Sequence, residues 1–180
     1  TFVHTLQRGR ELALLGRVDE ARRDLEWVVA GYGSHGRSDM SMPLYQLGFL
    51  TRLQGHALQA VEMQQRALHA VAAGSRAKRS SARILVELGL AQWAAGDGTA
   101  ARATLESALA VYAEKFTQAP PEQADALSGL GQIELAARVP AKALPRLQEA
   151  DRYWQLLDPK SRWAGESAYW LARCYQSLGR

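Results

Sequence analysis

Residues 47–60 read LGFLTRLQGHALQA, and residues 88–101 repeat the same pattern as LGLAQWAAGDGTAA. Both stretches contain a Leu-Gly pair, a second glycine seven residues after the first, and an alanine twelve residues after the first. A third copy, LGQIELAARVPAKA at residues 130–143, keeps the Leu-Gly pair and the alanine but has Arg138 in place of the second glycine. The three copies predict a repeated structural unit, and this unit decides the fold.

The pattern recurs with a nearly constant period along the whole chain. The first glycines of the copies are Gly9, Gly48, Gly89 and Gly131, and the matching alanines are Ala21, Ala60, Ala101 and Ala143. The glycines are 39, 41 and 42 residues apart, and a partial fifth copy has Ala172 another 41 residues on. Apolar residues at spacings of three and four around these positions are typical of amphipathic helices.

Each copy predicts an antiparallel pair of helices. We expect the small residue of the first helix to meet the alanine of the second, so that the two backbones approach closely. The second glycines should end helices. The predicted helices span 3–15, 18–32, 41–54, 56–73, 79–95, 97–116, 121–137, 140–157 and 163–178. Pro43, Pro121 and Pro140 fall in first turns, whereas Pro145 lies a turn further in, so we expect its helix to start late or to bend there.

This pattern resembles the tetratricopeptide repeat (TPR), on the evidence of Leu47-Gly48, Gly55 and Ala60 and the equivalent residues of the next two copies. Its period exceeds the usual period of about 34 residues and is similar to that of kinesin light chains and many bacterial regulators. The resemblance implies an all-α, right-handed superhelix of about nine helices, a single domain over residues 1–180. Its repeats would cover about 1–38, 39–78, 79–120 and 121–162, with a partial copy at 163–180. Because the chain begins at Thr1 and stops just after a helix-ending glycine, we expect it to be part of a larger protein.

The composition is that of a folded chain, with 47% hydrophobic and 22% charged residues and a net charge of +4. Only four lysines occur, so the positive charge comes mostly from arginine, which favours acidic partners. No apolar stretch approaches the length of about 18 residues that a membrane span needs, and no leader pattern is visible. With the single cysteine, Cys174, these features lead us to expect a cytoplasmic location.

The motifs that could carry catalysis are weak. Residues 31–36, GYGSHG, match the literal glycine fingerprint of dinucleotide-binding proteins, but they follow a predicted helix rather than a strand, so we interpret them as an inter-repeat linker. The four histidines lack metal-ligand spacing, and Cys174 lies among apolar helix residues as a core residue would. Acidic pairs such as Glu122 with Asp125 are interpreted as caps and solvated surface. We therefore expect no enzyme activity, no catalytic residue, no cofactor and no metal.

The resemblance also implies a binding groove, because in TPR proteins the first helices line the concave face. The predicted partner-binding residues are Met42, Tyr45, Phe49, Arg52, Arg83, Val86, Leu90, Trp93, Gln132, Leu135, Tyr169 and Arg173. The same positions of the repeat also select Asp125, Ser128 and Gln176, which we leave out of that set. Aromatic rings and arginine are the residues that interface hot spots favour. Trp27, Trp154 and Trp163 fall outside this face and are assigned to packing between helices.

The sequence contains no asparagine, which reduces the number of recognition modes that the groove could use. Chaperone-binding TPR domains clamp a terminal carboxylate with asparagine and lysine, and kinesin-light-chain grooves also use asparagine, so neither mode transfers. We expect a groove for an extended or helical protein segment with apolar anchors and some acidic residues. The chain would then be a protein-interaction module of a larger, bacterial signalling or regulatory protein.

Two alternatives stay open from the sequence. The first is self-association into a homodimer through the last helix, which contains Trp170 and Tyr175 and lacks a following partner. The second is binding of an anion or a nucleic acid by the basic cluster Arg76, Lys78, Arg79 and Arg83. We expect no membrane partner.

Overall fold

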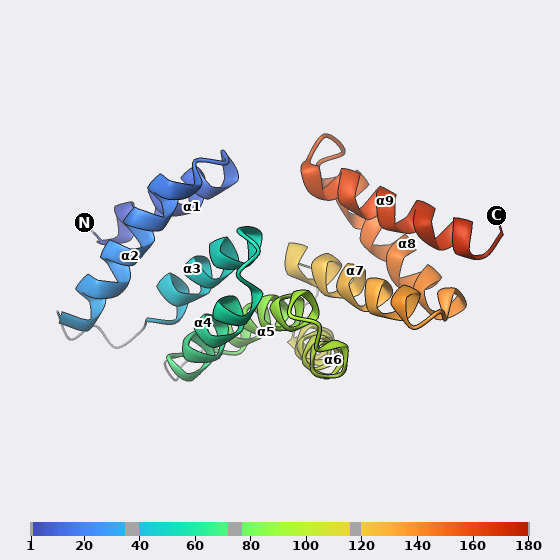
Figure 1. Ribbon diagram of the computed structural model, residues 1–180, viewed down its shortest axis with the longest axis horizontal. Coiled ribbons are helices and arrows are strands. Elements are labelled where there is room, and N and C mark those ends of the chain that lie inside the picture. The colour runs from blue at the N-terminus through green and yellow to red at the C-terminus, as the bar shows by residue number, and fades with distance from the viewer. Residues whose placement is uncertain (1, 35–39, 72–76, 116–119, 180) are drawn as a thin grey trace.

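The computed structural model describes residues 2–34, 40–71, 77–115 and 120–179, and these residues form nine helices and no strand. The helices are α1 (Phe2–Leu14), α2 (Val18–Ser34), α3 (Ser41–Leu53), α4 (Ala57–His69), α5 (Ala77–Ala94), α6 (Gly98–Lys115), α7 (Pro121–Ala136), α8 (Pro140–Leu157) and α9 (Arg162–Ser177). Successive helix pairs stack into an arc, with α1 and α2 at one end and α8 and α9 at the other (Figure 1). The predicted all-α solenoid is confirmed. The largest difference in bounds is at α4, which ends four residues before the predicted position.

The tight turn inside each pair depends on one residue with a left-handed backbone. The glycines in this conformation include Gly16, Gly55, Gly96 and Gly179, with φ between 72° and 89°. In the fourth pair Arg138 takes the same conformation, with φ of 59°. The amide of the next residue closes the turn, as where Asp97 N donates to the Gln92 carbonyl oxygen at 2.9 Å. The predicted helix-ending role of the glycines is therefore confirmed, and in the fourth pair an arginine adopts the same turn.

The first glycine of each copy lets its two helices pack closely. A Cβ atom built on Gly89 would lie 2.6 Å from Leu105 Cγ, whereas the nearest atom of Ala101 is its carbonyl oxygen at 3.3 Å. The expected close approach of the glycine to the backbone of the alanine is confirmed, and the leucine four residues after the alanine also packs over the glycine. In the second pair this leucine is replaced by Gln64, which is buried and donates from Nε2 to the Tyr45 carbonyl oxygen at 3.0 Å.

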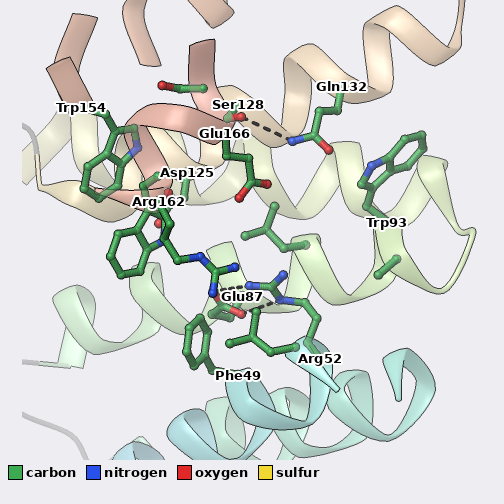
Figure 2. A pocket seen from close by; sticks show the side chains of 15 residues that line it. Phe49, Arg52, Glu87, Trp93, Asp125, Ser128, Gln132, Trp154, Arg162 and Glu166 are labelled. Atoms are coloured by element: carbon green, nitrogen blue, oxygen red, sulfur yellow. Dashed lines mark hydrogen bonds and ion pairs between the residues drawn. The ribbon is translucent and has the colours of Figure 1, made fainter. Parts of the chain in front are cut away.

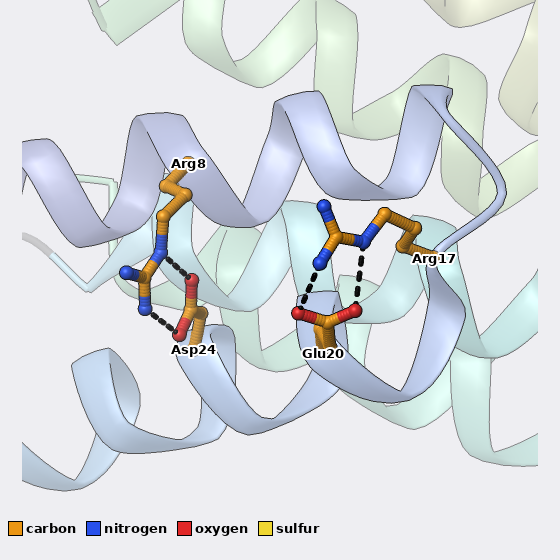
Figure 3. Close-up of polar contacts among 4 residues, drawn as sticks. All are labelled: Arg8, Arg17, Glu20 and Asp24. Carbon is orange, nitrogen blue, oxygen red and sulfur yellow. Dashed lines mark hydrogen bonds and ion pairs between the residues drawn. The ribbon is translucent and has the colours of Figure 1, made fainter.

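A bidentate ion pair joins the helices of the first pair (Figure 3). Arg8 of α1 donates from Nε and Nη2 to the two carboxylate oxygens of Asp24 in α2, each over 2.6 Å. These hydrogen bonds from Arg8 lower the pKa of Asp24. A second pair, Arg17 with Glu20, spans the turn at 2.6 Å but is exposed. The Arg8 contact therefore constrains how α1 and α2 are rotated against each other.

Pro145 does not delay its helix. The helix α8 begins at Pro140 and continues through Pro145 to Leu157, so the expected late start is wrong. A proline does occupy the first position of α7 and of α8, as predicted, because the first turn needs no amide donor there. Within the described part of the chain, none of the helices is long and apolar enough to cross a membrane.

The glycine-rich stretch 31–36 is not a loop throughout. The helix α2 extends to Ser34, so the first four residues of the stretch are helical. His35 and Gly36 lie outside the described residues. The backbone conformation that would cradle a pyrophosphate is therefore missing from the described part of this stretch.

Candidate functional site

The concave side of the arc contains two adjoining pockets of about 340 and 320 Å³. Both are lined by Phe49, Glu87, Asp125, Trp154 and Trp163, so we treat them as one site and call it the central groove. These five residues come from α3, α5, α7, α8 and α9 in turn. The groove therefore crosses several repeats instead of lying inside one helix pair.

The local helix pattern explains why these side chains reach the groove. In α3, Leu47 and Leu50 are buried in the core, while Phe49 and Arg52, three residues apart, share the groove-facing side. The Arg52 guanidinium carbon lies 5.6 Å from the centre of the Phe49 ring. One face of α3 thus packs in the core, and the adjacent face, which carries Phe49 and Arg52, lines the groove.

The structure brings together eight of the twelve predicted residues. The residues that line the central groove are Met42, Tyr45, Phe49, Arg52, Arg83, Leu90, Trp93 and Gln132. Val86 is instead only 1% exposed and packs in the core between helices, so its predicted contact with a partner is wrong. Leu135 packs beside the buried cluster of Ala143, Leu147 and Cys174. Tyr169 and Arg173 are absent from the lining, because the groove meets α9 near its first turns and these residues lie further along.

The predicted packing role of two tryptophans is confirmed, and they also border the groove. Trp154 is 7% exposed and belongs to a buried cluster against which Trp163 packs, and the two rings stack with centres 5.6 Å apart and line both pockets. The search by repeat positions considered first helices only, and it therefore missed Trp154 at the end of α8 and Trp163 at the start of α9. Trp27 stacks on Phe2 with ring centres 4.9 Å apart, yet it remains 54% exposed.

The groove arginines already have carboxylate partners within the chain. Arg52 Nε lies 2.9 Å from Glu87 Oε2, and Arg83 Nε lies 2.6 Å from Glu122 Oε1. Both contacts join the first helix of one pair to the first helix of the next. Glu122 is thus a groove ion-pair partner, and its interpretation as a solvated cap is wrong. The two arginines that were predicted to contact a partner are therefore paired with carboxylates of the chain itself.

Two other carboxylates project into the groove without such a partner. Asp125 from α7 and Glu166 from α9 both line the larger pocket (Figure 2). Among the described residues, no side chain forms a hydrogen bond or ion pair with either of them. Burial, and then the neighbouring carboxylates of Glu87 and Glu122, hold the pKa of Asp125 well above its usual range. Asp125 was interpreted from the sequence, together with Glu122, as a cap or a solvated surface residue. It is instead a groove residue, so that interpretation is wrong for Asp125 as well.

The basic cluster at residues 76–83 is described only in part. Arg76 lies outside the described residues, and the side chain of Lys78 is not described. Arg79 is exposed, whereas Arg83 is directed into the central groove toward Glu122. The same described ranges contain no group of three His, Cys, Asp or Glu residues placed to hold a metal ion.

Comparison with known proteins finds similarity in structure only. No protein-family model and no curated protein matches the sequence. A kinesin-light-chain-like protein of Podosopora anserina with nearly identical TPR-like repeats matches with a TM-score of 0.71 and 24% identity, over 98% of this chain and 85% of that one. BtubC from P. vanneervenii matches with a TM-score of 0.66 and 22% identity, over 96% of this chain and 66% of that one.

A third match is a chain of the APC/C hetero-tetramer Cut9–Hcn1, with a TM-score of 0.72 and 20% identity. It covers 97% of this chain but only 30% of the larger one. The class of protein is therefore an all-α helical repeat protein. Its fold is that of the TPR-like repeat proteins.

Proposed function

We propose that this chain is a protein-interaction module that binds a protein or peptide segment in the central groove. The observation that carries the proposal is the set of aromatic rings that four helices place around one groove. They are Phe49 of α3, Trp93 of α5, Trp154 of α8 and Trp163 of α9. Phe49, Trp93 and Trp163 are partly exposed, and such large rings bury much area on binding at a small entropic cost, as interface anchors do, whereas Trp154 is 7% exposed and stacks on Trp163.

The shape of the groove favours a segment of polypeptide as the ligand. Its lining runs from α3 to α9 across successive repeats, which suits an extended or helical peptide that contacts several helices in turn. On this proposal the module belongs to a larger, bacterial signalling or regulatory protein. The preference for arginine over lysine and the alanine-rich helices support that part of the proposal.

The test uses selection from a displayed library of random twelve-residue peptides. We expect the wild-type chain to enrich peptides that the variant Phe49→Ala/Trp93→Ala no longer binds. Trp27→Ala is the matched control, because it removes an exposed tryptophan outside the groove and should leave binding unchanged. Circular dichroism confirms that each variant keeps its helices. The groove is the wrong site if enriched peptides bind the double variant as well as they bind the wild type.

Self-association through α9 is a second candidate, favoured by one observation. Tyr169 is 53% exposed and lies in an edge-to-face contact with Trp170, with ring centres 5.2 Å apart. A homodimer would cover this exposed ring, whereas Tyr175 accepts a hydrogen bond from Gln148 at 2.9 Å and is directed toward α8. Light scattering at high protein concentration tests this candidate: Tyr169→Glu should dissociate a dimer, and a wild-type monomer would rule the dimer out.

A further inference from the structure

We propose that the central groove receives a basic side chain of its partner, an arginine or a lysine, between the aromatic rings and the carboxylates of Asp125 and Glu166. This inference rests on the proposed function and specifies the chemistry of the bound segment. The net positive charge of the chain suggested an acidic partner. The arrangement of charges inside the groove points to the opposite.

The first step concerns which groove charges remain available. Arg52 and Arg83 are each neutralised by a carboxylate of the next first helix. Asp125 and Glu166 line the larger pocket together with Arg52 and Arg162, and the charge of Arg52 acts on both, but among the described residues neither carboxylate has a direct ion-pair partner. A cationic group of a bound segment would supply one. An acidic segment would instead place a carboxylate next to these two, which costs repulsion and desolvation together.

The second step concerns the aromatic walls. Guanidinium groups of the chain itself already lie over rings of the groove: Arg52 over Phe49 at 5.6 Å, and Arg162 over Trp163 at 5.8 Å from the ring centre. These contacts are within the range of cation–π attraction. They show that the groove rings accept a planar cation. Arg162 is exposed, so its head group can turn into solvent when a partner's cation enters.

The third step concerns how the two features coincide. Trp163 and Glu166 lie three residues apart near the start of α9, and both face the pocket into which Asp125 of α7 projects. Figure 2 shows Glu166 pointing toward the middle of this pocket, with Trp154 and Trp93 on opposite sides of it. A basic side chain there would meet a ring on one side and a carboxylate on the other. That combination recognises a cation and disfavours an anion.

The test compares two synthetic arrays of twelve-residue peptides that share the same apolar anchors. One array has only arginine and lysine at its charged positions, and the other has only aspartate and glutamate. We expect binding in the basic array, with affinity falling as salt rises. The isosteric variant Asp125→Asn/Glu166→Gln should weaken the selected peptides by at least about tenfold. Glu149→Gln is the control, because it neutralises an exposed carboxylate of α8 outside the groove.

Arg162→Gln sharpens the test, since it removes the chain's own cation from the pocket. Basic peptides should bind this variant as tightly as the wild type or more tightly. Peptides from the acidic array that bind the wild type and lose binding in Phe49→Ala/Trp93→Ala would overturn the inference while leaving the proposed function intact. Unchanged affinity in the Asp125→Asn/Glu166→Gln variant would also overturn it. Binding in neither array would refute the proposed function and the inference together.

Discussion

The guanidinium of Arg52 on α3 forms a two-point contact with the carboxylate of Glu87 on α5, over 2.9 Å from Nε and 3.2 Å from Nη2. The two residues belong to consecutive helix pairs, so this contact ties one repeat to the next along the groove. Only 20% of the Arg52 side chain and 7% of the Glu87 side chain are exposed. Although burial opposes its charge, Glu87 raises the pKa of Arg52.

Removing Arg52 should therefore destabilise the solenoid. Arg52→Ala leaves the Glu87 carboxylate buried without its partner, and we expect the free energy of unfolding to fall by about 2–4 kcal/mol. Urea denaturation followed by circular dichroism measures this change. The double variant Arg52→Ala/Glu87→Ala should cost less than the sum of the two single variants, with a coupling of about 1–3 kcal/mol. Additive losses would mean that the contact contributes little.

Glycine is required where α7 meets α8. A Cβ atom on Gly131 would lie 2.5 Å from Leu147 Cγ, so Gly131→Ala should lower stability by about 1–3 kcal/mol through overpacking. Gly165 in α9 is the matched control, because no atom lies within 4 Å of its Cβ position. Gly165→Ala should raise stability by about 0.5–1 kcal/mol, as alanine favours a helix. Thermal unfolding of both variants should thus shift in opposite directions.

Replacing Arg138, in the turn between α7 and α8, should stabilise the protein. Arg138 has φ of 59°, a conformation that a residue with a Cβ adopts at a cost of about 1–2 kcal/mol. Arg138→Gly removes this cost, but glycine also has more conformational freedom in the unfolded chain, which cancels part of the benefit. We therefore expect Arg138→Gly to raise the free energy of unfolding by up to about 1 kcal/mol. Gly96→Ala, in the equivalent turn with φ of 89°, should lose about 1 kcal/mol. Equal melting temperatures for Arg138→Gly and the wild type would contradict this account.

Asp125 should reduce stability at neutral pH. Because its pKa is raised by burial and by Glu87 and Glu122, the folded state holds the proton more tightly than the unfolded chain does. The contribution of Asp125 to stability is therefore fully present below its pKa in the unfolded chain, and it is lost as the pH rises through its pKa in the folded state. Asp125→Asn should raise the melting temperature at neutral pH and flatten its dependence on pH. The same variant should weaken basic peptides, which a purely structural role would not predict.

Asp24 provides the contrasting case. Its pKa is lowered by the hydrogen bonds from Arg8, so its contribution to stability is present above the unfolded pKa and is lost as the pH falls through the folded pKa. Asp24→Asn should lower the melting temperature at neutral pH, and the difference from the wild type should shrink on acidification. Melting temperatures measured at a series of pH values for Asp24→Asn and Asp125→Asn test whether the two variants change stability in opposite directions. Parallel curves for the wild type and Asp24→Asn would contradict the assignment.

Part of the groove could be predicted from the register of the repeat. Phe49, Arg52, Leu90 and Trp93 were placed there because equivalent positions of successive first helices face the same side. Val86 was placed incorrectly, since the repeat position does not reveal which side of α5 the following helices cover. The partners Glu87 and Glu122 were missed, because an ion pair between repeats depends on how the repeats stack.

The sequence by itself determined the repeat, the helices and the turns. Leu47-Gly48, Gly55 and their equivalents act over a few residues, through close packing and backbone conformation, so their effect can be derived from spacing alone. Only the tertiary structure decided the charge of the groove. Asp125, Glu166 and Trp163 meet because the arc curves α7 and α9 toward one pocket, and that curvature is the sum of contacts along the whole stack.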